Sequence, residues 1–119
     1  MTDILRTRPA TTPAMLAVFD DDATIAHALA FEGALARAEA TEGVISDELA
    51  HAIVDACITT AINSAELAEE SALAGTLAIP LVARLRATLS GDASKAVHKG
   101  ATSQDVADTV LMMQTRAAT

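Results

Sequence analysis

Apolar residues recur at steps of three or four along most of this chain, which is the spacing of amphipathic helices. The acidic run at 20–22 can cap a long helix that continues to about Glu42 and ends at Gly43. One stripe of this helix mixes apolar and acidic residues: Ile25, Leu29, Glu32, Leu35 and Glu39. The segment 13–19 begins with proline and predicts a short helix, whereas residues 1–12 are expected to be extended.

Four more helices are expected farther along the chain, and their predicted first or capping residues are Ser46, Asn63, Pro80 and Thr102. Asn63 and Thr102 each have an acidic residue three positions on, which is the spacing of a capping box. The last helix is expected to bury Val106, Val110 and Met113, and residues 90–92 are expected to form a loop. No segment alternates strictly over the length of a strand, so we predict an all-α domain of five or six helices.

The composition indicates helices that pack closely around a thin core. The chain has 119 residues, about one domain, and 51% of them are hydrophobic while only 2% are aromatic. Much of the apolar content is alanine, which favours helices but buries little area per residue. We therefore expect the core to need further chain or partner subunits.

The charge balance excludes several classes of partner. The net charge is −8, which argues against nucleic acid and against an anionic membrane surface. No apolar run is long enough for a membrane helix, and the chain start does not resemble a signal peptide. Cys57 is the only cysteine and the histidines lack metal-ligand spacing, so we expect a reducing cytoplasmic setting and no metal site.

The segment 98–109 (His-Lys-Gly-Ala-Thr-Ser-Gln-Asp-Val-Ala-Asp-Thr) carries the strongest candidate chemistry. Thr102, Ser103 and Asp105 stand at a predicted helix N-terminus, where free amides and the helix dipole favour an anion. Gly100 would let backbone approach a ligand closely. The two lysines of the chain, at 95 and 99, flank His98. On spacing alone, a plain helix cap and a carboxylate or phosphate pocket both remain open.

Other titratable side chains have ordinary interpretations. His98 by itself could be a surface histidine, and His27 and His51 are expected to be unremarkable helix residues. Glu32 and Glu39 are expected to edge toward solvent or to pair with an arginine. The arginines considered as their partners are Arg37, Arg84 and Arg86.

The same segment, 98–109, resembles the first signature of the aspartase/fumarase superfamily, His-x-Gly-x-Thr-Ser-x-Asp-x-x-Asp-Thr. Its residues 100–105, Gly-Ala-Thr-Ser-Gln-Asp, resemble the 3-carboxy-cis,cis-muconate cycloisomerase family in particular. Three further segments, 13–19, 31–40 and 79–82, resemble the opening, the long second helix and the Ile-Pro-Leu-Val segment of that family. The resemblance covers roughly residues 11–116.

The resemblance implies that residues 1–119 form the N-terminal helical domain of the aspartase/fumarase fold, without the central helical bundle and the C-terminal domain. It implies lactonisation of 3-carboxy-cis,cis-muconate, a small tricarboxylate, in a cytoplasmic homotetramer without metal or organic cofactor. Each active site would be shared between subunits, so this chain alone would be inactive. Thr102, Ser103 and Gln104 would bind substrate, His98 would act in catalysis, and Gly100 and Asp105 would support the helix entrance.

Two alternatives remain open. One is an enzyme like adenylosuccinate lyase, which would need a phosphate site for which Arg6 and Arg8 could be recruited. The other is a non-catalytic helical interaction module. Where the cycloisomerase family commonly has Gly-Asn before Ile-Pro-Leu-Val, residues 75–78 of this chain read Gly-Thr-Leu-Ala, which bears on the choice of substrate.

Overall fold

The computed structural model describes residue 5 and residues 8–119, and its regular structure there is entirely helical. The elements are η1 (Arg8–Ala10), α2 (Pro13–Val18), α3 (Asp21–Thr41), α4 (Asp47–Thr59), α5 (Ser64–Ala74), α6 (Ala78–Ala87), α7 (Gly91–Ala96) and α8 (Ser103–Ala118). All six helices expected from the apolar pattern are present, and the all-α prediction is confirmed.

Two local expectations are wrong. The loop expected at 90–92 is instead the start of α7, a helix of six residues that begins at Gly91. Part of the segment expected to be extended forms the 3-10 turn η1, where Arg8 donates to the carbonyl of Thr11. The earlier part of that segment, including Arg6 and the chain start that does not resemble a signal peptide, lies outside the described residues.

Side-chain caps explain where five of the helices begin, including α2, where Thr12 accepts from the Met15 amide at 3.2 Å, and four longer ones. At each one, a polar side chain before the first turn accepts a hydrogen bond from the amide three residues on. The pairs are Asp20 with Ala23 (2.8 Å), Ser46 with Leu49 (3.2 Å), Asn63 with Glu66 (3.0 Å) and Thr102 with Asp105 (3.3 Å). These bonds satisfy donors that a helix leaves without partners at its start, so local sequence fixes these starts.

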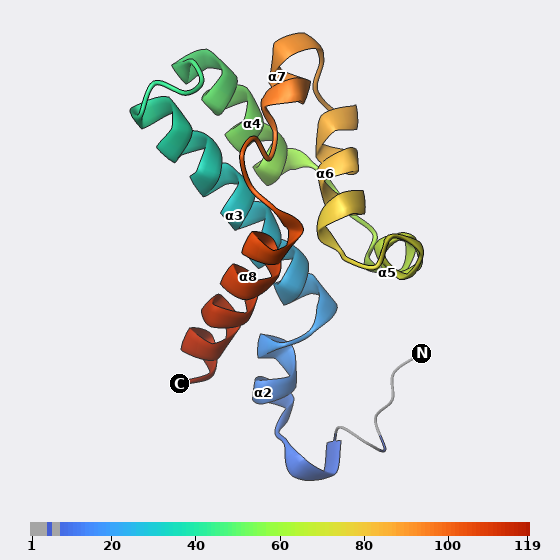
Figure 1. Ribbon diagram of the computed structural model, residues 1–119. Coiled ribbons are helices and arrows are strands. Elements are labelled where there is room, and N and C mark those ends of the chain that lie inside the picture. The colour runs from blue at the N-terminus through green and yellow to red at the C-terminus, as the bar shows by residue number, and fades with distance from the viewer. Residues whose placement is uncertain (1–4, 6–7) are drawn as a thin grey trace.

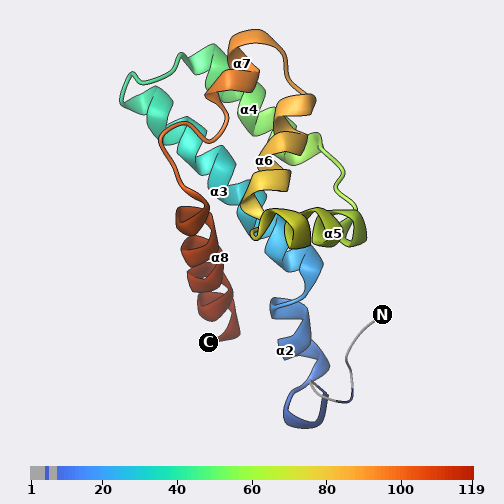
Figure 2. The same ribbon diagram turned by 45° about the vertical axis from the view of Figure 1, so that its right-hand side comes forward.

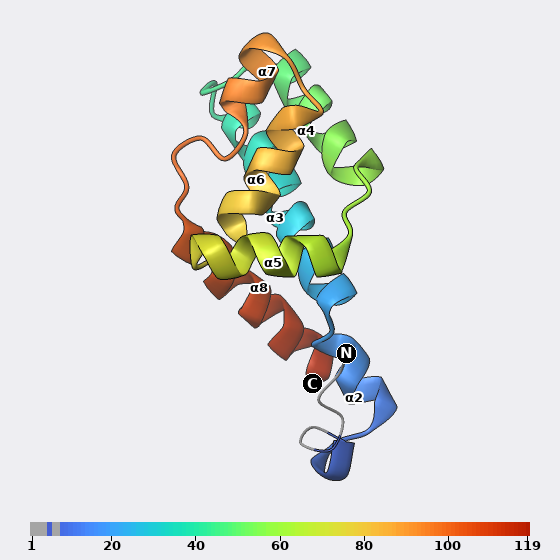
Figure 3. The same cartoon turned by 90° about the vertical axis from the view of Figure 1, so that its right-hand side faces the viewer.

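Helix α3 is the central element of the fold. It packs along α4 on one side and against α8 on another, as Figures 1 and 2 show from two directions. Seen from the side in Figure 3, α5 crosses the molecule between α6 and α8. The connection from α7 to α8 (residues 97–102) passes over α3, which brings the signature segment onto the long second helix.

The core consists of two clusters that meet along α3. One joins α3, α4, α6 and α7, with Ile53, Leu85 and Val97 fully buried. The other joins α3, α5, α6 and α8 around Leu81 and Val106. In the part of the chain that the structure describes, six of the fifteen buried hydrophobic residues are alanines, in keeping with a thin core. None of the described helices has the length and apolar character that crossing a bilayer requires.

Candidate functional site

A small cleft lies where α6, the 97–102 connection and the start of α8 meet. Its volume is about 160 Å³, and its lining is Ala78, Ile79, Val82, Arg86, His98 and Ser103. The polar members are a guanidinium, an imidazole and a hydroxyl, all of which can donate hydrogen bonds to an anion. The apolar members, Ala78, Ile79 and Val82, form another part of the lining.

The start of α8 reaches the cleft through Ser103. The capping box expected from Thr102 and Asp105 is present, because each backbone amide donates to the side chain of the other residue, at 2.8 and 3.3 Å. The amides of Ser103 and Gln104 belong to the first turn and have no acceptor within the helix. The Ser103 hydroxyl and these amides therefore offer donors to a carboxylate.

The turn before α8 has a special backbone. Both His98 (φ 62°) and Gly100 (φ 75°) are in the left-handed region, and the Ala101 amide donates to the His98 carbonyl at 3.4 Å. At Gly100 a β-carbon would meet nothing within 4 Å, so glycine is needed there for its conformation rather than for space. His98 carries the same conformation with a side chain, which is uncommon and costly.

His98 contacts a carboxylate that lies 66 residues earlier in the chain. Its Nδ1 atom is 2.5 Å from Oε1 of Glu32, and the Glu32 side chain is completely buried. Burial raises the pKa of the Glu32 carboxyl above its ordinary value, although the nearby His98 and Arg86 act in the opposite direction. The expectation that Glu32 faces solvent or pairs with an arginine is therefore wrong.

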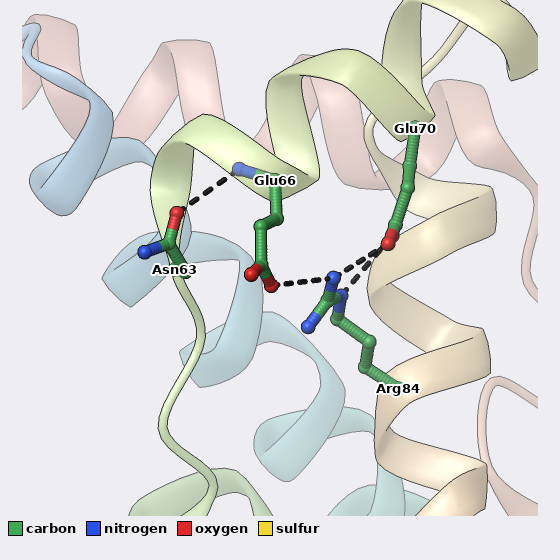
Figure 4. Close-up of polar contacts among 4 residues, drawn as sticks. All are labelled: Asn63, Glu66, Glu70 and Arg84. Atoms are coloured by element: carbon green, nitrogen blue, oxygen red, sulfur yellow. Dashed lines mark hydrogen bonds and ion pairs between the residues drawn. The ribbon is translucent and has the colours of Figure 1, made fainter.

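The charge of the cleft comes from Arg86. Its Nη2 donates to the carbonyl of Val97 at 3.0 Å, which ties α6 to the turn that carries His98. Arg84, two residues earlier on α6, points elsewhere and pairs with Glu66 and Glu70 of α5 (Figure 4). Arg84 is therefore not a partner of Glu32 or Glu39.

The structure separates several other residues from the cleft. Gln104 donates to Asp108 at 2.7 Å, and neither it nor Thr102 is among the lining residues. Lys95 and Lys99 line a different hollow near the start of α4, together with Asp92. The two lysines beside His98 in sequence thus do not supply the positive charge of this cleft.

The structure also locates Thr76 and Arg8, two residues that bear on the choice of substrate, and the side chains that could bind a metal. The Thr76 hydroxyl, where the family commonly has an Asn, accepts the Ala78 amide at 3.3 Å near the start of α6. Arg8 lies in η1, which precedes α2 at the opposite end of the molecule from α7 (Figure 1). Across residue 5 and residues 8–119, no three His, Cys, Asp or Glu side chains gather as metal ligands would.

Sequence reasoning brought Ser103 and His98 to this site but missed Glu32 and Arg86. A signal for Glu32 existed, because it falls in phase with the apolar stripe of its helix, where a carboxylate is rarely left without a partner. Arg86 gave no comparable signal. It follows the buried Leu85 on a helix that also carries Arg84, and nothing local distinguishes the two arginines.

No family model matches this chain, but individual proteins do. A Bradyrhizobium diazoefficiens protein named 3-carboxy-cis,cis-muconate cycloisomerase is 47% identical over 108 residues, which cover 88% of this chain and 24% of that protein. A Pseudomonas putida protein of the same name is 42% identical, over 89% of this chain and 26% of its own length. An N-acetyl-S-(2-succino)cysteine lyase of Enterococcus italicus is 38% identical, over 87% of this chain and 22% of that protein.

Solved structures agree with these relatives. The 3-carboxy-cis,cis-muconate lactonizing enzyme of Pseudomonas putida matches with a TM-score of 0.84 and 42% identity, over 96% of this chain and 27% of that one. A fumarate lyase of Mesorhizobium sp. BNC1 matches with a TM-score of 0.80 and 36% identity, over 86% of this chain and 24% of that one. Both have the aspartase/fumarase fold, so the predicted fold is confirmed. The chain spans about a quarter of the length of these relatives, in their N-terminal part.

Proposed function

We propose that this chain, which resembles the N-terminal quarter of 3-carboxy-cis,cis-muconate cycloisomerases, supplies a carboxylate-binding part of such an active site. In that reaction one substrate carboxylate adds across a double bond, and a proton is delivered to the neighbouring carbon. The observation that carries the proposal is the convergence of Arg86, His98 and Ser103 on one cleft, in a chain 47% identical to a protein of that name.

Within this proposal the cleft residues divide the work. Arg86, the Ser103 hydroxyl and the first amides of α8 hold one substrate carboxylate, because all of them donate hydrogen bonds to an anion. His98 contacts the substrate beside them. Thr102 does not line the cleft, but its hydroxyl, whose oxygen accepts the Asp105 amide, keeps its own proton as a donor for a substrate that extends beyond the cleft.

The size of the cleft suggests that other parts of the enzyme complete the site. Ligand pockets generally measure about 300–1,000 Å³. A cleft of about 160 Å³ suits one end of a tricarboxylate rather than the whole molecule. We propose that the rest of the site comes from further chain and from partner subunits of a homotetramer, that no cofactor is needed, and that the 119 residues alone are inactive.

A chimera tests this function directly. The matching segment of the Pseudomonas putida relative is replaced by this chain, and loss of 3-carboxymuconate ultraviolet absorbance is followed. Activity of the chimera with none from the chain alone is the expected result. A chimera that is folded and tetrameric but inactive on 3-carboxymuconate, yet active on N-acetyl-S-(2-succino)cysteine, would replace the proposed substrate with that of the other relative. A folded chimera inactive on both would favour a non-catalytic module.

One variant with a matched control ties the activity to this cleft. Ser103→Ala removes a hydroxyl from the first residue of α8, and we expect KM to rise about tenfold, as for the loss of one hydrogen bond to a charged group. Ser64→Ala makes the same change at the first residue of α5, outside the cleft, and should leave KM unchanged. Equal effects of the two changes would remove Ser103 from the substrate site.

A further inference from the structure

We propose that Glu32 is a positioning residue for His98: its buried carboxylate accepts a hydrogen bond from Nδ1–H of the imidazole, which keeps the single ring proton on Nδ1 and leaves Nε2 unprotonated and available to the cleft. The hydrogen bond on one ring nitrogen decides the state of the other, because neutral imidazole carries a single proton. The use of Nε2 toward a substrate rests on the proposed function, whereas the assignment of the proton does not.

The geometry of the pair carries this inference. Nδ1 of His98 and Oε1 of Glu32 are 2.5 Å apart, which places the two atoms in direct hydrogen-bond contact. The His98 side chain is 14% exposed while that of Glu32 is fully buried, so the contact is shielded from competing water. His98 also lines the cleft, and its Nε2 lies on the ring edge away from Nδ1.

The backbone around His98 is held in a conformation that it would not adopt unaided. A non-glycine residue at φ 62° is strained, and it keeps that conformation only where its surroundings impose it. Here Val97 is fully buried, its carbonyl accepts from Arg86, and the His98 carbonyl accepts from the Ala101 amide. These contacts fix the turn so that the imidazole reaches Glu32 on the neighbouring helix.

Glu32 has little else to do in the structure. Its second oxygen, Oε2, is buried without a hydrogen-bond partner among the described residues. A buried carboxylate with an unsatisfied oxygen destabilises a fold, so its presence calls for another explanation. Holding the proton of His98 on Nδ1 provides that explanation, and Glu32 does this without touching the cleft.

Several charged groups surround the pair from different elements. Arg86 of α6 favours the ionised form of Glu32, and Glu39, two turns along α3, opposes it. Lys99, next to His98, lies close enough to Glu39 to influence its carboxyl. The negative charge of Glu32 also raises the pKa of the Cys57 thiol of α4. A test must therefore separate the hydrogen bond from the general field of these groups.

Nitrogen NMR of the histidine rings provides this test on the 119-residue chain itself. Two-bond proton–nitrogen correlations at pH 8 report which ring nitrogen carries the proton, and His98→Gln identifies the signal. We expect the Nδ1–H form of His98 in about tenfold excess or more, as for a hydrogen bond to a charged group. His27 and His51 serve as internal references. A dominant Nε2–H form in the unaltered chain would overturn the proposal without any further variant.

Two charge-matched variants complete the experiment. Glu32→Gln should abolish the excess, because an amide can either donate to Nδ1 or accept from it. Glu39→Gln removes the same charge from the same helix but no hydrogen bond to His98, and it should preserve the excess. Loss of the excess in both variants would mean that the general electrostatic field of nearby charges, and not the hydrogen bond to Glu32, places the proton on Nδ1 of His98. An inactive chimera with Nδ1–H present would refute the proposed function and leave this inference standing.

Discussion

At the scale of single residues, the cleft depends on Arg86 more than on the lysines that flank His98 in sequence. The guanidinium lines the cleft and also bonds the Val97 carbonyl, whereas both lysines line another hollow. A long side chain can act several residues away from its own position, so neighbours in sequence need not be neighbours in a site. The lysines that flank His98 in sequence therefore add no charge to this cleft, whereas Arg86, from another helix, does.

Arg86→Gln in the chimera should raise KM for 3-carboxymuconate roughly 10- to 100-fold, which corresponds to the loss of a hydrogen bond between charged groups. Because glutamine can still donate to the Val97 carbonyl, the turn should keep its shape and kcat should change less. Steady-state kinetics check this, with Arg116→Gln at the exposed end of α8 as control. An unchanged KM in Arg86→Gln would show that the carboxylate binds elsewhere.

Cys57 is expected to be a poorly reactive thiol. Burial, helped by the charge of Glu32, raises the pKa of the Cys57 thiol to about 11. At pH 8 roughly one molecule in a thousand would then be the thiolate, which is the reactive form. Alkylation by iodoacetamide, followed by mass spectrometry, should be many times slower in the folded chain than in the same chain unfolded in guanidinium chloride. Equal rates would contradict the raised pKa.

At the scale of elements, helix starts follow local sequence and helix faces follow packing. Residues three apart decide a cap, so the starts of α3, α4, α5 and α8 could be predicted. The buried face of α8 was predicted less well. Gln114 is buried and donates to Thr24 of α3 at 2.9 Å, while Met113, expected in the stripe, is only partly buried. A polar residue can occupy a core face where a partner on another helix meets it.

Thr102→Ala tests the cap of α8. The substitution removes the acceptor for the Asp105 amide and should lower the free energy of unfolding by about 1 kcal/mol. For a chain of this size that corresponds to a fall in Tm of roughly 3–6 °C, measured by circular dichroism. Thr102→Ser keeps the hydroxyl and should cost much less. A similar loss in both variants would mean that the threonine methyl, not the cap, stabilises α8.

At the scale of the whole molecule, the fold leaves large apolar side chains uncovered. Leu73 of α5 is 92% exposed, and Leu111 and Met112 of α8 are more than half exposed. Single exposed apolar residues are ordinary, but two in succession on the outer face of α8 accompany a core rich in alanine. This distribution supports the proposal that further chain and partner subunits complete the site.

The dependence of stability on pH should reveal the opposite environments of two glutamates. The pKa of Glu32 is raised in the fold, so its favourable contribution is present below its unfolded pKa and is lost as pH rises through the folded value. Glu32→Gln should therefore gain stability relative to the unaltered chain as pH rises from 4 to 8. Thermal unfolding across this range measures the difference.

Glu70 supplies the contrast with the opposite sign. Its hydrogen bond to Arg84 lowers the pKa of its carboxyl, so its contribution is present above the unfolded pKa and is lost as pH falls through the folded value. Glu70→Gln should lose stability relative to the unaltered chain as pH rises, by a small amount because the pair is exposed. A relative gain with rising pH in both glutamine variants would contradict the assignment of Glu70, and a relative loss in both would contradict that of Glu32.

The sequence by itself determined the helical class, the starts of α3, α4, α5 and α8, the fold family and the presence of Ser103 and His98 near one helix entrance. Caps, apolar spacing and the signature segment are patterns of residues close together in the chain, so they can be recognised from the sequence alone. Only the tertiary structure decided that Glu32 meets His98 and that Arg86, rather than Arg84 or a lysine, faces the cleft. Those contacts join residues up to 66 positions apart, and they depend on how α3, α6 and a left-handed turn are placed against one another.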